Sequence, residues 1–146
     1  MKLNKQLLQM NRNFLICFVI SAISSAFISE LLSDYENHLN TTITIALGYV
    51  IYFVIFSILF YIDNKKRYEQ MSKNLIKKEL VYIASSFGIG EIVYLAVRWP
   101  TFYYFLEIEI EPFASSLISE IISTAAYMIM VTIFLKKTRT FKQPQT

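Results

Sequence analysis

Long apolar runs alternate with shorter polar stretches along the whole chain. Four of these runs reach the roughly 20 residues that a helix needs to cross the hydrocarbon core of a membrane. A helix satisfies its own backbone hydrogen bonds in lipid, so each run is predicted to be a transmembrane helix. The predicted helices cover residues 13–32, 43–62, 80–97 and 113–135.

The polar stretches between these runs suggest two tandem hairpins. Each half has a basic lead-in, a helix, an acidic connection, a second helix and a basic exit, which reads NKKRY at 64–68 and KKTRTF at 136–141. The predicted fold is therefore an all-α membrane protein, with four transmembrane helices in a single domain over residues 1–146. The predicted connections are residues 33–42, 63–79 and 98–112.

Composition agrees with a membrane protein. Hydrophobic residues make up 55% of the chain and charged residues only 17%, whereas soluble domains are about 25% charged. The single Cys17 cannot form an intrachain disulfide, and alone it makes no metal site. The sequence has no glycine-rich phosphate loop, no nucleophile with a partner base and no paired Cys or His. We therefore expect no enzymatic activity, cofactor, metal or nucleic-acid partner.

The distribution of basic residues predicts the orientation. Of the 14 Lys and Arg residues, all but Arg98 lie in the N-terminal arm, in residues 63–79 or in the C-terminal tail. Residues 33–42 and 98–112 are instead acidic. The positive-inside rule then places both termini and the 63–79 loop in the cytoplasm of a multi-pass cell-membrane protein, with the acidic loops outside.

Three carboxylates, Glu30, Glu91 and Glu120, lie inside the apolar runs, and Arg98 follows Glu91 by two helical turns. An ionised carboxylate in lipid costs several kcal/mol unless it is paired, hydrated or protonated. We expect these four groups to line an intramembrane polar pocket that is open to the outside and has its floor near Glu91. Simpler interpretations remain open: Glu30 ends the first helix, Glu120 bonds to nearby serines, and Arg98 is a structural counter-ion.

A short motif recurs around these carboxylates. It reads SSAFISE at 24–30, SSFGIGE at 85–91 and SSLISE at 115–120. Internal duplication and chance recurrence in a chain rich in Ser and Ile both explain it. The small residues beside each Glu are of the kind that lets membrane helices approach closely.

Two surface features suggest binding partners. The aromatic residues Trp99, Tyr103 and Tyr104 in the second outer loop suit the membrane interface, or a lid or stacking platform for sugar rings. The basic clusters bind anionic lipid head groups or simply fix the topology. These clusters are Lys65, Lys66, Arg67, Lys136, Lys137 and Arg139.

The helix exits YMIMVTIFLKKTRTF at 127–141 and DNKKRY at 63–68 resemble those of the GtrA-like family of small four-helix membrane proteins. This resemblance implies binding or translocation of a polyprenyl-phosphate-linked sugar in the assembly of surface polysaccharides or glycans. The basic inner loop would then meet the phosphate, and the outer pocket the sugar. Two alternatives stay open: a non-catalytic accessory or scaffold subunit of a larger membrane complex, and a proton-coupled exporter of small cationic solutes. Membrane lipids are expected partners, and four short helices enclose so little volume that a homo-oligomer or a complex is expected.

Overall fold

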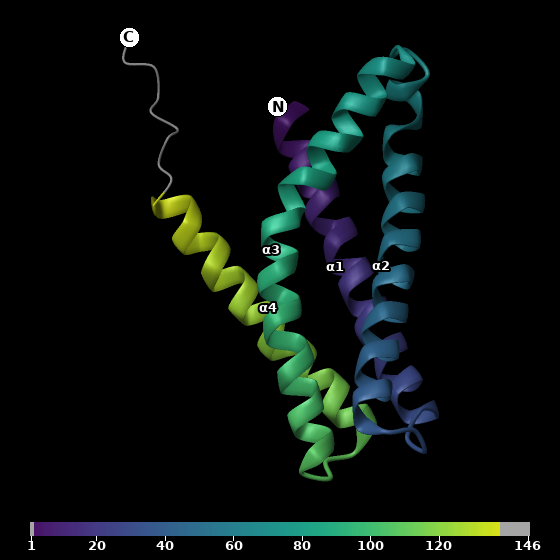
Figure 1. The fold of residues 1–146 in the computed structure, drawn as a ribbon. Coiled ribbons are helices and arrows are strands. Elements are labelled where there is room, and N and C mark those ends of the chain that lie inside the picture. The colour runs from purple at the N-terminus through teal and green to yellow at the C-terminus, as the bar shows by residue number, and fades with distance from the viewer. Residues whose placement is uncertain (1, 138–146) are drawn as a thin grey trace.

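The computed structural model describes the backbone of residues 2–137 and, within it, the side chains of residues 9, 12–78, 81, 90–130 and 133. The described chain runs up and down, with the α1–α2 and α3–α4 turns at one end and the α2–α3 turn at the other (Figure 1). No strand occurs among these residues, so the predicted all-helical class is confirmed. The helices are α1 (Lys2–Leu31), α2 (Asn37–Tyr68), α3 (Lys73–Glu107) and α4 (Pro112–Lys137).

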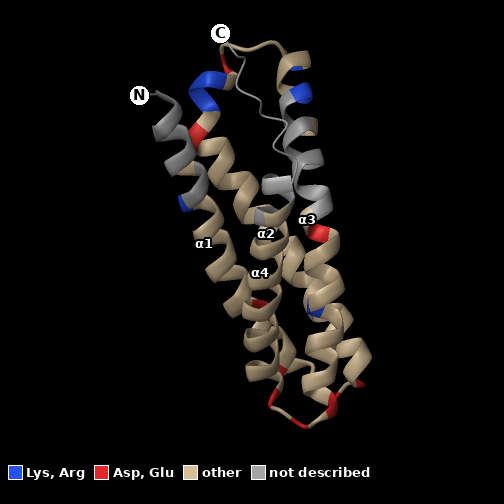
Figure 2. Ribbon diagram, turned by 90° about the vertical axis from the view of Figure 1, so that its left-hand side faces the viewer, with Lys and Arg blue, Asp and Glu red and all other residues tan. Residues whose placement is uncertain are grey.

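The two ends of the bundle differ in charge (Figure 2). We call the end with the α1–α2 and α3–α4 turns the acidic end, because Asp34, Glu36 and Glu109 lie there. We call the end with the α2–α3 turn the basic end, because Lys65 and Lys66 lie there in the last turn of α2.

Three described stretches are long and apolar enough to cross a membrane: Arg12–Leu31, Asn37–Tyr68 and Pro112–Met130. The predicted span 80–97 lies within α3, and its side chains at 80 and 82–89 lie outside the described residues.

The helices pack in a ring. Each helix contacts its two neighbours in the order α1, α2, α3, α4, and α4 also packs on α1. Gly48 of α2 marks a close approach to α1, because a β-carbon at this position would collide with the hydroxyl of Ser25. The ring therefore has an interior to which all four helices contribute.

Small polar side chains fill the acidic end of this interior. Ser29 of α1 donates a hydrogen bond to the carbonyl oxygen of Pro112 at 3.0 Å, and Asn40 of α2 donates to that of Ser29 at 2.9 Å. Buried hydroxyl and amide groups are thus satisfied by backbone carbonyls, while their small size lets the helices pack closely. The residues of this polar core are Ser25, Ser29, Asn40, Thr41, Thr44, Ser115, Ser116, Ser119 and Ser123.

The recurring serine motif has a packing role in two of its three copies. The copies at 24–30 and 115–120 lie on α1 and α4, which run in opposite directions and pack together. Ser25 and Ser29 of the first copy and Ser116 and Ser119 of the third are all buried. The serines of the second copy, at 85 and 86, lie outside the described side chains.

The helices extend further than predicted, and the loops are correspondingly shorter. The expected loop 63–79 is reduced to a turn at 69–72, and α2 begins at Asn37 inside the expected loop 33–42. The expected loop 98–112 is also wrong, since α3 continues through Pro100 to Glu107. Hydrophobicity predicts only the part of a helix that lies in hydrocarbon, whereas backbone hydrogen bonding continues into polar residues.

Two backbone hydrogen bonds close the end of α3. The amide of Ile110 donates to the carbonyl oxygen of Phe105 at 3.0 Å, and that of Glu109 donates to Leu106 at 3.1 Å. Glu109 has a φ of 61°, in the left-handed region. This is the Schellman arrangement that closes many helices, with a glutamate where glycine is usual.

Candidate functional site: an intramembrane cavity

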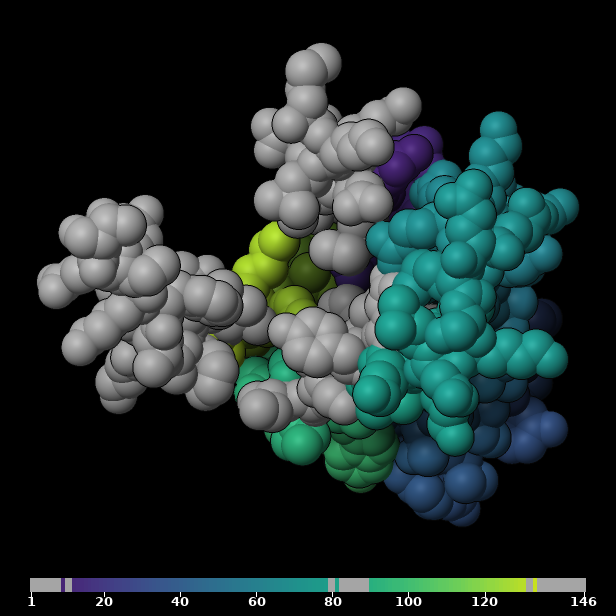
Figure 3. All heavy atoms as spheres, turned by 90° about the horizontal axis from the view of Figure 1, so that it is seen from above, coloured from purple at the N-terminus to yellow at the C-terminus, as the bar shows by residue number. Residues whose placement is uncertain are grey.

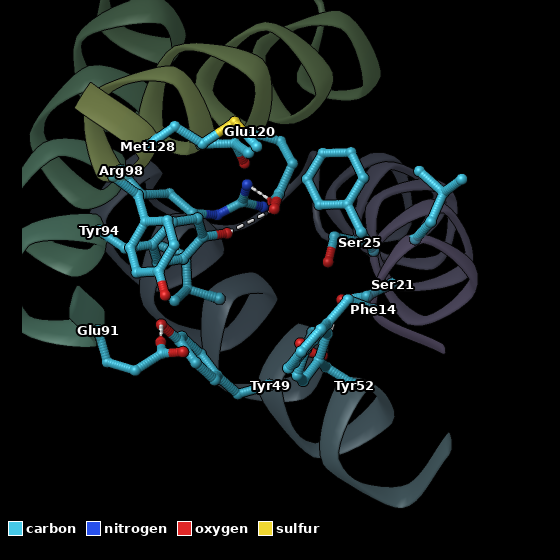
Figure 4. A pocket seen from close by; sticks show the side chains of 16 residues that line it. Phe14, Ser21, Ser25, Tyr49, Tyr52, Glu91, Tyr94, Arg98, Glu120 and Met128 are labelled. Carbon is cyan, nitrogen blue, oxygen red and sulfur yellow. Dashed lines mark hydrogen bonds and ion pairs between the residues drawn. The ribbon is translucent and has the colours of Figure 1, made fainter. Parts of the chain in front are cut away.

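A cavity of about 650 Å³ lies inside the ring, on the basic side of the polar core. All four helices of the one chain contribute to its wall. The expected homo-oligomer or complex stays a prediction. Figure 4 shows its lining side chains. They are Phe14, Leu15, Phe18, Ser21 and Ser25 of α1, Ile45, Gly48, Tyr49 and Tyr52 of α2, Glu91, Tyr94 and Arg98 of α3, and Glu120, Thr124, Tyr127 and Met128 of α4.

An ion pair between Arg98 of α3 and Glu120 of α4 forms the floor of the cavity. Both residues are buried, with 1% and 6% of their surface exposed. Tyr94 donates a hydrogen bond to the second oxygen of Glu120 at 2.6 Å, and Ser116 lies 3.4 Å from an Arg98 nitrogen. The two charges thus compensate each other, as buried charges must to be tolerated.

Glu91 reaches the cavity from another side, with Tyr94 between it and the Arg98–Glu120 pair (Figure 4). Its carboxylate accepts a hydrogen bond from the hydroxyl of Tyr49 on α2. Within the described part of the chain, no Lys or Arg side chain pairs with it. Glu91 is therefore the carboxylate of the cavity whose charge the described residues do not compensate.

Glu30, the third predicted carboxylate, does not line the cavity. It is exposed at the acidic end, and its Oε2 accepts a hydrogen bond of 3.3 Å from the backbone amide of Phe113. Phe113 lies in the first turn of α4, where unpaired amides and the helix dipole favour a negative group. Glu30 therefore belongs to a helix terminus and not to a pocket.

The sequence suggested a pocket that opens to the acidic end. The structure differs, because the polar core and the Arg98–Glu120 pair fill that region. Towards the basic end α4 instead leans away from the other helices (Figure 1). From that end, yellow-green side chains of α4 are visible inside the outline of the bundle (Figure 3). The buried serines of α1 and α4 lie in the acidic halves of these two helices.

Two lining residues towards the basic end are also exposed at the surface of the bundle. Leu15 of α1 is 64% exposed and Met128 of α4 is 63% exposed, yet both line the cavity. We call this part of the cavity rim the mouth. Both residues belong to stretches that are long and apolar enough to span a membrane.

The predicted aromatic loop is part of α3. Trp99 and Tyr103 are stacked with ring centres 5.2 Å apart, and the Trp99 indole donates to Thr42 of α2 at 3.0 Å. Tyr104 is exposed and does not line the cavity. These rings tie α3 to α2 near the acidic end and lie apart from Glu91.

The predicted lipid-binding residues are only partly described. Lys65 and Lys66 are exposed at the basic end, and the Arg67 guanidinium lies 5.5 Å from the ring centre of Tyr68. The side chains of Lys136 and Lys137 lie outside the described residues, as does the whole of Arg139.

The sequence predictions missed two tyrosines of the aromatic walls, Tyr49 and Tyr94. Tyr94 lies three residues after Glu91 and four before Arg98, a spacing that places all three on one helix face. Tyr49 lies in a run without any charge and gave no comparable signal, because its role depends on a partner from another helix.

No family model, curated protein or solved structure matches the chain. The resemblance to the GtrA-like family therefore stays a prediction.

Proposed function

We propose that the protein binds an amphipathic small molecule in the intramembrane cavity and carries it between the lipid and the basic side of the membrane. The single observation that carries this proposal is the cavity itself, about 650 Å³ in volume and reached through an apolar mouth. This volume lies within the range of small-molecule sites, about 300–1,000 Å³. A ligand that enters from lipid needs an apolar part, and the polar lining suits its head group.

We also propose that α3 is a fourth span and that both termini are cytoplasmic. The gathering of basic residues at the end with the α2–α3 turn, and of several acidic residues at the other end, supports this orientation (Figure 2). The antiparallel packing of α3 with α4 supports the additional span, because α4 itself contains an apolar stretch long enough to cross.

A lipid-linked saccharide is the version of this ligand that the GtrA-like resemblance implies. Tyr and Phe rings in the cavity wall favour it, since sugar rings stack on aromatic faces. Tyr52 at the cavity and Lys65 at the basic end are 13 residues apart on α2, roughly 20 Å along the helix. A single sugar in the cavity would therefore leave its phosphate short of Lys65.

An accessory subunit without a ligand is the rival proposal. It requires the cavity to be a packing defect or to be filled by a segment of another chain. The two proposals differ in whether a small amphiphile binds saturably.

The test uses a neutral C12 alcohol that carries a photoreactive diazirine, with the full-length protein in lipid nanodiscs. Saturable labelling is expected on cavity residues such as Phe14 and Tyr52, and excess unlabelled alcohol should suppress it. Thr124→Trp fills the cavity and should abolish this labelling, whereas Ile121→Trp, on the exposed face of α4, should not. Labelling confined to lipid-facing residues, unaffected by competitor, would contradict the proposal.

A further inference from the structure

We infer that the ligand of the cavity is an amphipathic organic cation with one positive charge, held by the Glu91 carboxylate between aromatic walls. This inference rests on the proposed function and specifies its ligand class.

The charges of the lining residues are the first reason. Arg98 and Glu120 neutralise each other across α3 and α4, so neither is available for a ligand without breaking a buried ion pair. Among the described lining residues, Glu91 is then the acidic side chain without a basic partner, and the lining carries one net negative charge when Glu91 is ionised. A partly buried carboxylate whose partner in the described part of the chain is the Tyr49 hydroxyl would be stabilised by a cation placed beside it.

The walls beside Glu91 are the second reason. The rings of Tyr49 and Tyr94 meet nearly at right angles, at 88°, with their centres 5.9 Å apart. Tyr52 and Tyr127 also line this space. Aromatic faces attract cations within about 6 Å, and organic ammonium groups are commonly recognised by several rings together with a carboxylate. The ring of Tyr94 already lies beside a cation, since the Arg98 guanidinium is 5.9 Å from its centre.

The shape of the cavity is the third reason, and it separates an organic cation from a metal ion or a phosphate. Phe14, Phe18, Leu15 and Met128 give the part nearest the mouth an apolar surface, which a hydrated ion would not use. A phosphate inside would face an uncompensated Glu91 and no free cation in the described lining. A monovalent cation with apolar substituents matches both the apolar part of the cavity near the mouth and the part around Glu91.

The experiment compares two ions of one shape, tetraphenylphosphonium and tetraphenylborate, together with the neutral octyl glucoside. Binding to the full-length protein in nanodiscs is measured by calorimetry, with empty nanodiscs as the blank. The cation should bind about tenfold or more tightly than the anion. Glu91→Gln should remove this preference and Glu91→Asp should keep it. Glu30→Gln removes a carboxylate outside the cavity and should leave the preference for the cation unchanged.

Equal affinities for the two ions, or a cation preference that survives in Glu91→Gln, would overturn the inference. Tighter binding of the glucoside than of the cation would also overturn it, in favour of a saccharide head group. None of these results removes the proposed function, which fails only if the neutral alcohol shows no saturable labelling. If Glu91→Gln does not fold, the comparison of the two ions on the unmodified protein still decides the question.

Discussion

Arg98 of α3 is ion-paired with Glu120 of α4 at the boundary between the polar core and the cavity. Each residue lies in an otherwise apolar segment, and neither would be tolerated there alone. Among the described lining residues, their pairing leaves Glu91 as the charged group without a partner of opposite charge. One pair therefore stabilises the α3–α4 contact and also determines which ligands the remaining space can accept.

Removal of either partner is expected to be strongly destabilising. Arg98→Met leaves the Glu120 charge buried, and Glu120→Gln leaves the Arg98 charge buried. Breaking a buried pair in this way costs about 3–5 kcal/mol. The free energy of unfolding, measured by titration of mixed micelles with dodecyl sulfate and followed by Trp99 fluorescence, should fall by this amount in each variant.

The double variant Arg98→Met/Glu120→Gln is the control for this interpretation. It removes both charges and keeps an acceptor for Tyr94, so it should be more stable than either single variant. If the loss of unfolding free energy in the double variant equals the sum of the losses in the two single variants, the two residues do not act as a pair.

The contact between Gly48 and Ser25 makes a second prediction. A β-carbon at position 48 would collide with the Ser25 hydroxyl, although its distance to the Ser25 β-carbon would be an ordinary 3.7 Å. Gly48→Ala should therefore lower the free energy of unfolding by about 1–3 kcal/mol, as overpacking does. Ser25→Ala in the same chain should recover most of the loss. A loss that persists in the double variant would place the strain elsewhere.

The sequence predicted the helices and the polarity of their ends because hydrophobicity and charge are local properties. Glu91, Glu120 and Arg98 were recognised as candidate cavity residues because charge in an apolar run is conspicuous. Glu30 was grouped with them wrongly, since no local signal shows that it reaches the first turn of α4. Tyr49 was missed for the same reason. The direction in which the cavity opens depends on where α1 and α4 separate, a tertiary property.

Glu109 provides a prediction about the end of α3. Its φ of 61° is unfavourable for a residue with a β-carbon, and glycine adopts it without strain. Glu109→Gly should raise the free energy of unfolding by up to about 1 kcal/mol. Glu107→Gly, two residues earlier in the last helical turn, should instead lower it by roughly 0.5–1 kcal/mol. If both substitutions raise the free energy of unfolding, or both lower it, the assignment of this helix end is contradicted.

The proposed topology is testable with single cysteines in a Cys17→Ala background. Gln70→Cys lies in the α2–α3 turn, Asp34→Cys in the α1–α2 turn and Glu111→Cys in the α3–α4 turn. An impermeant thiol reagent added to intact cells should label positions 34 and 111 but reach position 70 only after permeabilisation. Labelling of 111 together with 70, and not with 34, would mean that α3 does not cross the membrane.

The position of Met128 predicts an effect on the rates of ligand binding, because Met128 lines the mouth and is exposed at the outer surface of α4. Met128→Trp narrows the mouth without altering Glu91 or the tyrosines around it. Association and dissociation of tetraphenylphosphonium should therefore both slow several-fold, while the Kd stays nearly constant. Ile129→Trp is the matched control, because Ile129 is equally exposed on α4 but does not line the cavity. Stopped-flow measurement in nanodiscs separates these effects. A changed Kd with unchanged association would make position 128 a contact for the bound ligand, and the route of entry would then have to lie between other helices.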